Sequence, residues 1–170
     1  MTVDGRRGLD FDPIERARSQ WAAAGWTDAA DGMAAITSLM RAHQIVLARV
    51  EASLRPLGLT FARYEVLMLL WFSRRGSLPM KVIGSRLQVH PTSVTNAVDR
   101  LEDAGLVTRS THPDDRRAYL VALTPSGHEL VERATKALNA EVFEQPVLSP
   151  RDQRTLVDVL TRLRHSAGDF

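Results

Sequence analysis

The sequence of 170 residues contains no cysteine. This absence excludes a disulfide framework, a thiolate metal site, a catalytic cysteine and a thiol-based redox switch, and it is typical of a reducing cytosol. Long hydrophobic runs are also missing: the most apolar stretch, residues 64–72, is nine residues long, whereas a membrane span needs about 20. No cationic segment followed by an apolar run of about 7 to 15 residues opens the sequence, so no secretion signal is expected. We therefore predict a cytoplasmic protein with no membrane contact.

Neither sign of charge is in large excess along most of the chain. The 22 Lys and Arg residues exceed the 20 Asp and Glu residues by only two. By region, residues 1–62 carry seven basic and seven acidic side chains, residues 63–117 nine and six, and residues 118–170 six and seven. The central basic excess is a reason to look for a polyanionic partner, although a solvated helical face would give the same count.

Helix-forming signals follow one another along most of the chain. Its length is that of about one domain, and its 44% hydrophobic and 25% charged residues are typical of a soluble globular protein. Apolar residues at spacings of three and four predict the helices, together with the capping residues Asp12, Thr60, Thr124 and Ser149. They are expected over residues 13–24, 33–54, 61–71, 79–87, 91–104 and 125–145, and from residue 150 onward.

The period of the pattern changes after Gly105. Residues 106–111 are rich in β-branched side chains, and residues 118–123 alternate with a period of two, so both segments are predicted strands joined by a polar turn. Helix, short turn, helix and hairpin is the order of a winged helix-turn-helix. The predicted fold class is therefore mainly α with a small β-hairpin wing, with long helices at both ends of the lobe.

The outer face of the predicted helix 91–104 is the candidate DNA-reading surface. A helix held across another by a tight turn can enter the major groove, which is about 12 Å wide, and an asparagine there can pair with adenine. A polar face that is merely solvated is the alternative reading, since most amphipathic helices have one. The outward polar residues are Thr92, Ser93, Thr95, Asn96, Asp99 and Arg100.

The hairpin tip carries a second set of candidate DNA contacts. Arg116 and Arg117 can reach the phosphate backbone or the minor groove, whose negative potential attracts arginine. Asp115 can orient one guanidinium through a charge-assisted pair. The alternative is a surface turn with weak ion pairs, worth about 0 to 1 kcal/mol each.

At these positions the sequence resembles the MarR (multiple antibiotic resistance regulator) family of bacterial transcription factors, over roughly residues 33–165. The resemblance implies a ligand-responsive repressor that acts as a homodimer on a pseudo-palindromic operator of double-stranded DNA. It also implies wing roles for Asp115 and Arg117, with Arg117 in the minor groove. The residues that carry it are Leu101-Glu102, Gly105-Leu106-Val107, Asp115-Arg116-Arg117, Leu123-Thr124 and Gly127.

Two positions depart from the family pattern. His90 stands where many relatives have a capping serine, and Asn96 stands where many have arginine, so the operator sequence does not carry over. The segment with Trp21 and Trp26 is similar to the extra helix of urate-responsive members. Because their ligand-binding arginine falls at Asn96, the resemblance argues against urate as the effector.

The apolar faces of the long first helix and of the two last helices exceed what one small lobe can cover. A second copy of the chain is the simplest way to bury them. We therefore predict an N-terminal extension with a short helix in residues 1–32, a helical dimerisation region in residues 33–57 and 125–166, and a winged helix-turn-helix DNA-binding lobe in residues 58–124.

The resemblance also implies an effector pocket for a small aromatic or phenolic acid, between the dimerisation helices and the lobe. Met40, His43, Tyr64 and Trp71 are the candidate lining residues, although core packing explains such side chains equally well.

No enzyme, metal or cofactor site is predicted. The five histidines form no H-x-x-x-H pair and stand near no cluster of carboxylates. A nucleophile elbow and a phosphate-cradling glycine loop are missing as well. Two functions remain open: a ligand-responsive repressor, and a winged interaction or architectural module without sequence preference.

Overall fold

The computed structural model describes residues 8–113, 115–145 and 147–170, and for Arg116 and Arg117 it describes the backbone alone. The chain forms two compact parts that divide within one long helix, between Ala48 and Arg49. Each part is considered separately below.

The N-terminal part is a helical hairpin. Helix α1 (Pro13–Ala23) begins at Asp12, whose carboxylate accepts a hydrogen bond of 2.9 Å from the N–H of Ile14. Helix α2 (Thr27–Leu54) follows. The sequence predicted a start at Met33 instead, because residues 27–32 have no apolar period. Their alanines favour a helix by intrinsic propensity, and α2 therefore begins earlier.

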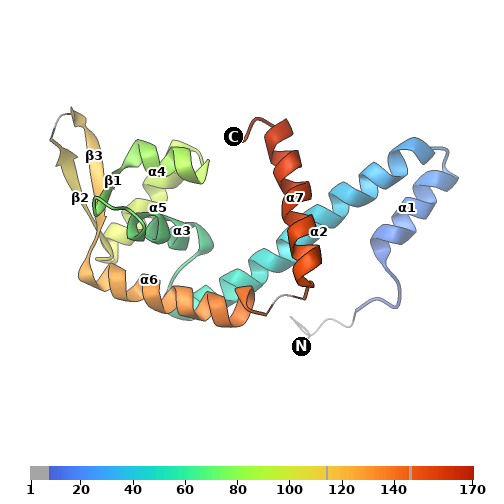
Figure 1. The fold of residues 1–170 in the computed structure, drawn as a ribbon, viewed down its shortest axis with the longest axis horizontal. Coiled ribbons are helices and arrows are strands. Elements are labelled where there is room, and N and C mark those ends of the chain that lie inside the picture. Colours follow the sequence, from blue (N-terminus) through green and yellow to red (C-terminus); the bar gives the residue numbers. More distant parts are fainter. Residues whose placement is uncertain (1–7, 114, 146) are drawn as a thin grey trace. The chain divides into compact units, whose positions relative to one another are not determined.

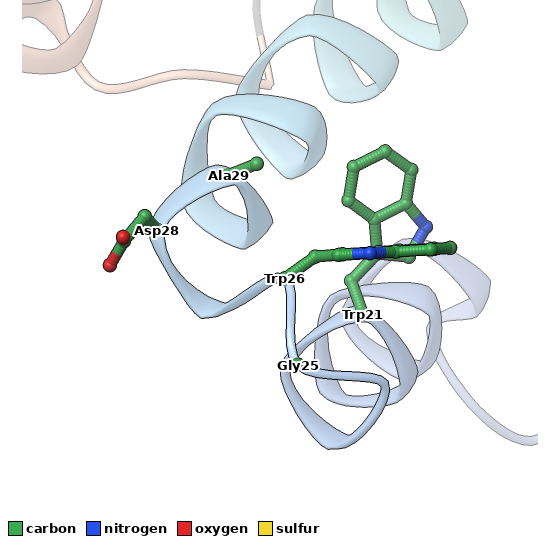
Figure 2. A pocket seen from close by; sticks show the side chains of 5 residues that line it. All are labelled: Trp21, Gly25, Trp26, Asp28 and Ala29. Atoms are coloured by element: carbon green, nitrogen blue, oxygen red, sulfur yellow. The ribbon is translucent and has the colours of Figure 1, made fainter.

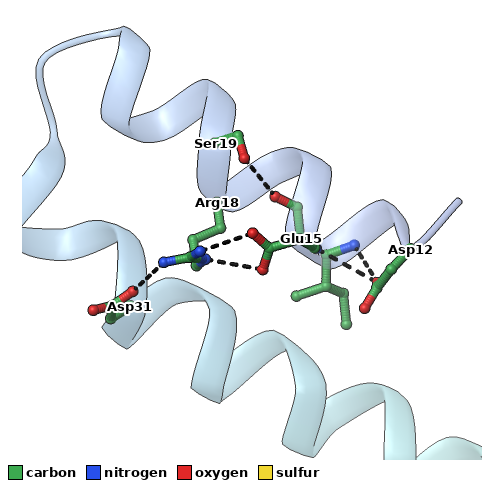
Figure 3. A network of polar contacts seen from close by, with 6 residues as sticks. Asp12, Glu15, Arg18, Ser19 and Asp31 are labelled. Carbon is green, nitrogen blue, oxygen red and sulfur yellow. Dashed lines mark hydrogen bonds and ion pairs between the residues drawn. The ribbon is translucent and has the colours of Figure 1, made fainter.

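An arginine joins α1 to the first turns of α2 (Figure 3). The Arg18 guanidinium donates to Glu15 on its own helix at 2.8 Å and to Asp31 on α2 at 2.9 Å. The hydrogen bond from Arg18 lowers the pKa of Glu15 from its ordinary value. All three groups are exposed, so water screens their charges and the pairs add little to stability.

Two tryptophans pack on each other at the hairpin turn (Figure 2). The ring centroids of Trp21 and Trp26 are 5.2 Å apart, with an edge-to-face angle of 72°. Gly25 makes the turn between them with a φ of 89°, which favours glycine. Both tryptophans line a shallow pocket, and Asp28 borders this pocket but points away from the rings.

The second part is a lobe of helices on a small sheet, followed by a C-terminal helix (Figure 1). The predicted helices and hairpin are present. In chain order its elements are the 3-10 turn η1 (Arg55–Leu57), α3 (Phe61–Trp71), β1 (Ser77–Pro79), α4 (Met80–Leu87), α5 (Pro91–Asp103), β2 (Val107–His112), β3 (Asp115–Leu123), α6 (Pro125–Leu138), the π-helical turn η2 (Asn139–Phe143) and α7 (Pro150–Ser166).

The sheet has one strand more than the sequence predicted. Strand order is β1-β3-β2, all antiparallel, with Leu78 of β1 opposite Val121 of β3. β1 is three residues long and ends in Pro79, too short to show an alternating pattern. Pairing with β3 therefore decides that this segment is a strand.

Besides Asp12, predicted helix caps are present at three further starts. Thr60, Thr124 and Ser149 each accept a hydrogen bond from a backbone N–H in the first turn of α3, α6 and α7. Such caps contribute about 1 kcal/mol each. α6 was expected to reach Gln145, but its α-helical part ends at Leu138 and a π-helical turn continues to Phe143.

The core lies among α3, α4, α5, α6 and the inner face of the sheet. Burying a leucine or isoleucine side chain contributes roughly 1.5 to 3 kcal/mol, and the contacts of the core hold α5 against the sheet. The largest fully buried side chains are Leu54, Leu67, Leu70, Ile83, Leu101 and Leu138.

Candidate nucleic-acid interface

Helix α5 begins at a histidine cap. The imidazole Nδ1 of His90 accepts a hydrogen bond of 3.3 Å from the N–H of Thr92. Pro91 occupies the first helical position, where an N–H has no intrahelical partner. The ring nitrogen therefore takes the acceptor role that a serine hydroxyl plays in many helix caps.

The two faces of α5 differ in burial as the sequence predicted. Val94, Val98 and Leu101 are buried. The Thr95 hydroxyl donates 3.1 Å to the Pro91 carbonyl, whereas the Asn96 amide makes no hydrogen bond within the described part of the chain. The amide is therefore free to bind an external group. The predicted DNA contacts Thr92, Ser93, Thr95, Asn96 and Arg100 are all exposed.

The turn between α4 and α5 is tight. A Cβ atom at Gly84 would lie 3.3 Å from Cγ2 of Val94, so the two helices approach closely there. The chain then passes through Gln88 with a φ of 54°, the left-handed region that glycine favours. Because the sequence has glutamine at this position, no glycine marks the turn.

The hairpin of β2 and β3 forms the wing beside α5 (Figure 1). Its register runs from Val107 opposite Leu123 to Thr111 opposite Tyr119, and it shifts between Thr111 and His112. Asp115 is exposed and opens β3 opposite His112. The side chains of Arg116 and Arg117 lie outside the described residues, and their roles stay predictions.

One residue of the predicted outer face points elsewhere. Asp99 pairs with Arg109 on β2 and is of intermediate exposure, whereas Asn96 and Arg100 on the same helix are exposed. Sequence reasoning missed Arg109, because nothing local to residues 106–111 indicates that its partners are on the preceding helix.

The predicted effector residues fall in both parts of the chain. Met40 and His43 are exposed on α2, in the first part of the chain. Tyr64 and Trp71 lie on α3 in the lobe. Tyr64 is buried, and Trp71 packs its ring 5.1 Å from that of His128.

A cleft of about 300 Å³ lies between α3 and α6. Trp71 lines it directly. Tyr64 reaches its wall through a hydrogen bond of 3.1 Å between the phenol and the Thr135 hydroxyl. The lining is mostly apolar and aromatic and includes one carboxylate and one ammonium group; it consists of Met68, Trp71, Phe72, Val131, Glu132, Thr135 and Lys136.

Two kinds of feature are absent from the described residues. Among the described residues no group of three His, Asp or Glu side chains is placed to hold a metal ion. Within the same part of the chain, no helix combines the length and the apolar character that a bilayer crossing requires.

Known proteins resemble both the lobe and the flanking helices. The MarR family model matches residues 59–119. Sco5413, a MarR family transcriptional regulator from Streptomyces coelicolor, is 50% identical, with 82% of this chain and 97% of that chain covered and a TM-score of 0.75. Sco3205, a MarR family transcriptional regulator from Streptomyces coelicolor in complex with DNA, is 26% identical, with 78% and 85% covered and a TM-score of 0.69. CouR from Rhodococcus jostii RHA1 bound to p-coumaroyl-CoA is 30% identical, with 74% and 87% covered and a TM-score of 0.62.

Proposed function

Because this chain belongs to the MarR family of transcriptional regulators, we propose that it binds double-stranded DNA sequence-specifically and represses transcription as a homodimer on a pseudo-palindromic operator. The observation that carries the proposal is the polar, exposed face of α5, held beside a hairpin by a fully buried opposite face. The DNA complex of Sco3205 supports it by analogy.

In this mechanism α5 enters the major groove from its N-terminal end. The unpaired amide of Asn96 reads an adenine edge, and Thr92 and Ser93 bind phosphate oxygens near the positive end of the helix dipole. Arg100 binds a phosphate further along the groove. At the wing, Asp115 orients an arginine, Arg116 binds the backbone, and Arg117 enters the minor groove.

Uncovered apolar residues support the homodimer. In the first part of the chain, Ile36, Met40 and Leu47 on α2 are 53%, 60% and 36% exposed. In the second part no residue of α7 is buried along its described length, and Leu156 and Leu163 are both exposed. A second copy that covers these faces around a two-fold axis would set two α5 helices about 34 to 36 Å apart, one turn of DNA.

The cleft between α3 and α6 supports a role for a small aromatic acid as effector. Trp71 and Met68 offer an apolar wall for a ring, and the ammonium of Lys136 offers a charge for a carboxylate. CouR, which is bound to p-coumaroyl-CoA, the thioester of a phenolic acid, supports an aromatic ligand. Binding would lift repression only to the extent that the ligand prefers the conformation with misplaced α5 helices.

We propose that the protein regulates transcription in the cytoplasm by binding alone, without catalysis and without a metal or cofactor. The residues of α5 and of the wing supply hydrogen-bond donors and charge, and chemistry on the DNA plays no part.

A gel shift tests DNA recognition. The labelled probe is the DNA that flanks the gene of this protein, and the competitor is a scrambled duplex. Specific binding at least about 10³-fold tighter than binding to the scrambled duplex supports the proposal. Equal affinity for both duplexes contradicts it and favours an architectural module.

Two variants separate the roles of helix and wing. Asn96→Ala is expected to relax specificity at one base step, whereas Arg117→Ala is expected to weaken binding to all sequences and to reduce the salt slope by about one. Wild-type binding by the Arg117→Ala variant would remove the wing from the mechanism.

Calorimetry tests the effector. Titration with 4-hydroxybenzoate and with p-coumaroyl-CoA, each followed by a gel shift, is expected to show binding that lowers operator affinity. Lys136→Met should weaken the binding of 4-hydroxybenzoate, because its carboxylate loses the ammonium partner, and should leave operator affinity unchanged in the absence of ligand. Heat-silent titrations with unchanged operator affinity would count against a ligand of this class.

A further inference from the structure

Arg109 joins α5 to the first strand of the wing. Its guanidinium Nη2 pairs with Oδ1 of Asp99, and its Nε lies 3.3 Å from Oε2 of Glu102. Its backbone N–H also donates 3.2 Å to Oε1 of Glu102. One arginine on β2 therefore holds two carboxylates that are three residues apart, and so on one face of α5.

The burial of these groups shows why they occur together. The Arg109 side chain is 22% exposed, whereas those of Asp99 and Glu102 are 47% and 42% exposed. The Nε atom is shielded from solvent, and its geometry toward Glu102 is that of an ion pair without a hydrogen bond. A guanidinium is costly to bury unless opposite charges surround it. The two carboxylates are what allow Arg109 to lie between the strand and the helix.

We propose that Asp99, Glu102 and Arg109 form a clamp that sets the angle between α5 and the wing, and thereby lets both elements engage one duplex. The proposal rests on the DNA binding proposed above. Asp99 lies one helical turn after Asn96 and Thr95, so a change of helix angle at Asp99 moves the reading face. Arg109 is a positioning residue in this scheme and touches no DNA.

The clamp also neutralises an acidic residue on the reading helix. A carboxylate within a Debye length of phosphates, about 8 Å at physiological salt, is repelled by them unless a cation screens it. Pairing with Arg109 supplies that screening for Asp99. The exposed Arg100 next to it has no ion pair in the described part of the chain and stays free for a phosphate.

The sign of one substitution distinguishes the clamp from charge alone. Asp99→Asn removes a negative charge at the reading helix, so simple electrostatics predicts tighter binding to every duplex. The clamp predicts the opposite for the operator, because Arg109 loses a partner and α5 is no longer held at its angle. We expect Asp99→Asn to weaken operator binding about tenfold, with binding to scrambled duplex unchanged or tighter.

Arg109→Met gives a second, independent readout. We expect it to weaken operator binding at least as much as Asp99→Asn while the salt slope stays at the wild-type value, because no phosphate contact is lost. An arginine that bound phosphate directly would lower affinity for both duplexes and reduce the slope by about one. Arg133→Met, which removes an exposed charge of the same kind on α6, is the matched control and should leave the ratio of the two affinities unchanged.

The outcomes separate the two proposals. Fluorescence anisotropy with operator and scrambled duplexes, at three salt concentrations, measures all the affinities, and urea unfolding checks that each variant is folded. If Arg109→Met does not fold, Asp99→Asn still decides the question. Operator binding by Asp99→Asn that is as tight as wild type would overturn the clamp. A wild-type protein without any preference for the operator would instead overturn the proposed function.

Discussion

Gly127 on α6 lies directly against the main chain of Leu106 at the start of the wing. A Cβ atom at Gly127 would be 2.0 Å from the Leu106 carbonyl oxygen. That oxygen also accepts a hydrogen bond of 3.1 Å from the N–H of Thr124. The close approach explains why the motif Leu123-Thr124 is followed by a glycine three residues later: no side chain fits between the first turn of α6 and the turn that ends α5.

The first prediction is that Gly127→Ala strongly destabilises the lobe. Because the obstructing atoms are backbone, the methyl group can be accommodated only by moving α6 away from the sheet. We expect a loss of about 3 kcal/mol in the free energy of unfolding, at the upper end of the range for overpacking. Urea unfolding followed by circular dichroism measures it.

Gly32→Ala is the control for that prediction. Gly32 is within α2, and nothing lies within 4 Å of its missing Cβ, so alanine there should favour the helix by about 0.5 to 1 kcal/mol. Opposite signs for the two substitutions are expected. A Gly127→Ala protein as stable as wild type would show that α6 does not approach Leu106 so closely.

The second prediction concerns Thr124. Its hydroxyl accepts a hydrogen bond of 3.0 Å from the N–H of Gly127 and donates one of 2.7 Å to the Gly105 carbonyl. Thr124→Ala removes a helix cap and leaves a carbonyl with one partner fewer, so a loss of about 1 to 2 kcal/mol is expected. Thr124→Ser keeps the hydroxyl and should recover most of it. Thermal unfolding of both variants measures the difference.

The third prediction concerns the cap of α5. His90→Ala removes the acceptor for the N–H of Thr92 and should loosen the first turn of the helix by about 1 kcal/mol. His90→Ser restores an acceptor. Hydrogen exchange in the first turn of α5 is expected to be faster in the alanine variant only, and operator affinity should fall with it. Exchange in His90→Ala as slow as in the wild type would show that the histidine cap contributes nothing.

The fourth prediction is a pH dependence that comes from Glu65 on α3. Burial raises the pKa of this half-buried carboxyl above its ordinary value of 4.5. The folded state therefore binds the proton more tightly than the unfolded state. The contribution of Glu65 to stability is complete below pH 4.5 and is lost as the pH rises through the raised pKa. Stability in this window should fall with increasing pH.

Glu65→Gln tests the sign. Glutamine cannot ionise, so the variant should lack this decline and should be more stable than wild type at pH 7. Urea midpoints of both proteins, measured in half-unit steps from pH 4 to pH 7, give the comparison. A difference between them that does not change with pH would show that ionisation of Glu65 has no effect on folding.

Local patterns were sufficient for most of the helices and for the hairpin. Asp12, Thr60, Thr124 and Ser149 cap helices as their positions predicted, because a cap needs only neighbours within one turn. The start of α2 was missed by six residues, since alanine favours a helix without producing an apolar period.

In the candidate interface, too, the local sequence predicted one feature and missed another. The exposure of Thr92, Asn96 and Arg100 follows from the helical period once Val94 and Val98 face the core. The pairing of Asp99 with a strand residue does not follow from that period, because the helix sequence does not indicate which element packs beside the helix.

Short-range features of the sequence thus determine the fold class and the family: periods of 3.6 and 2.0, capping residues and a motif of fixed spacing. The strand β1, the contact of Gly127 with Leu106 and the partners of Arg109 became known only from the folded lobe. Each of them joins residues that are seven or more positions apart in the sequence, and local preferences carry no information about such contacts.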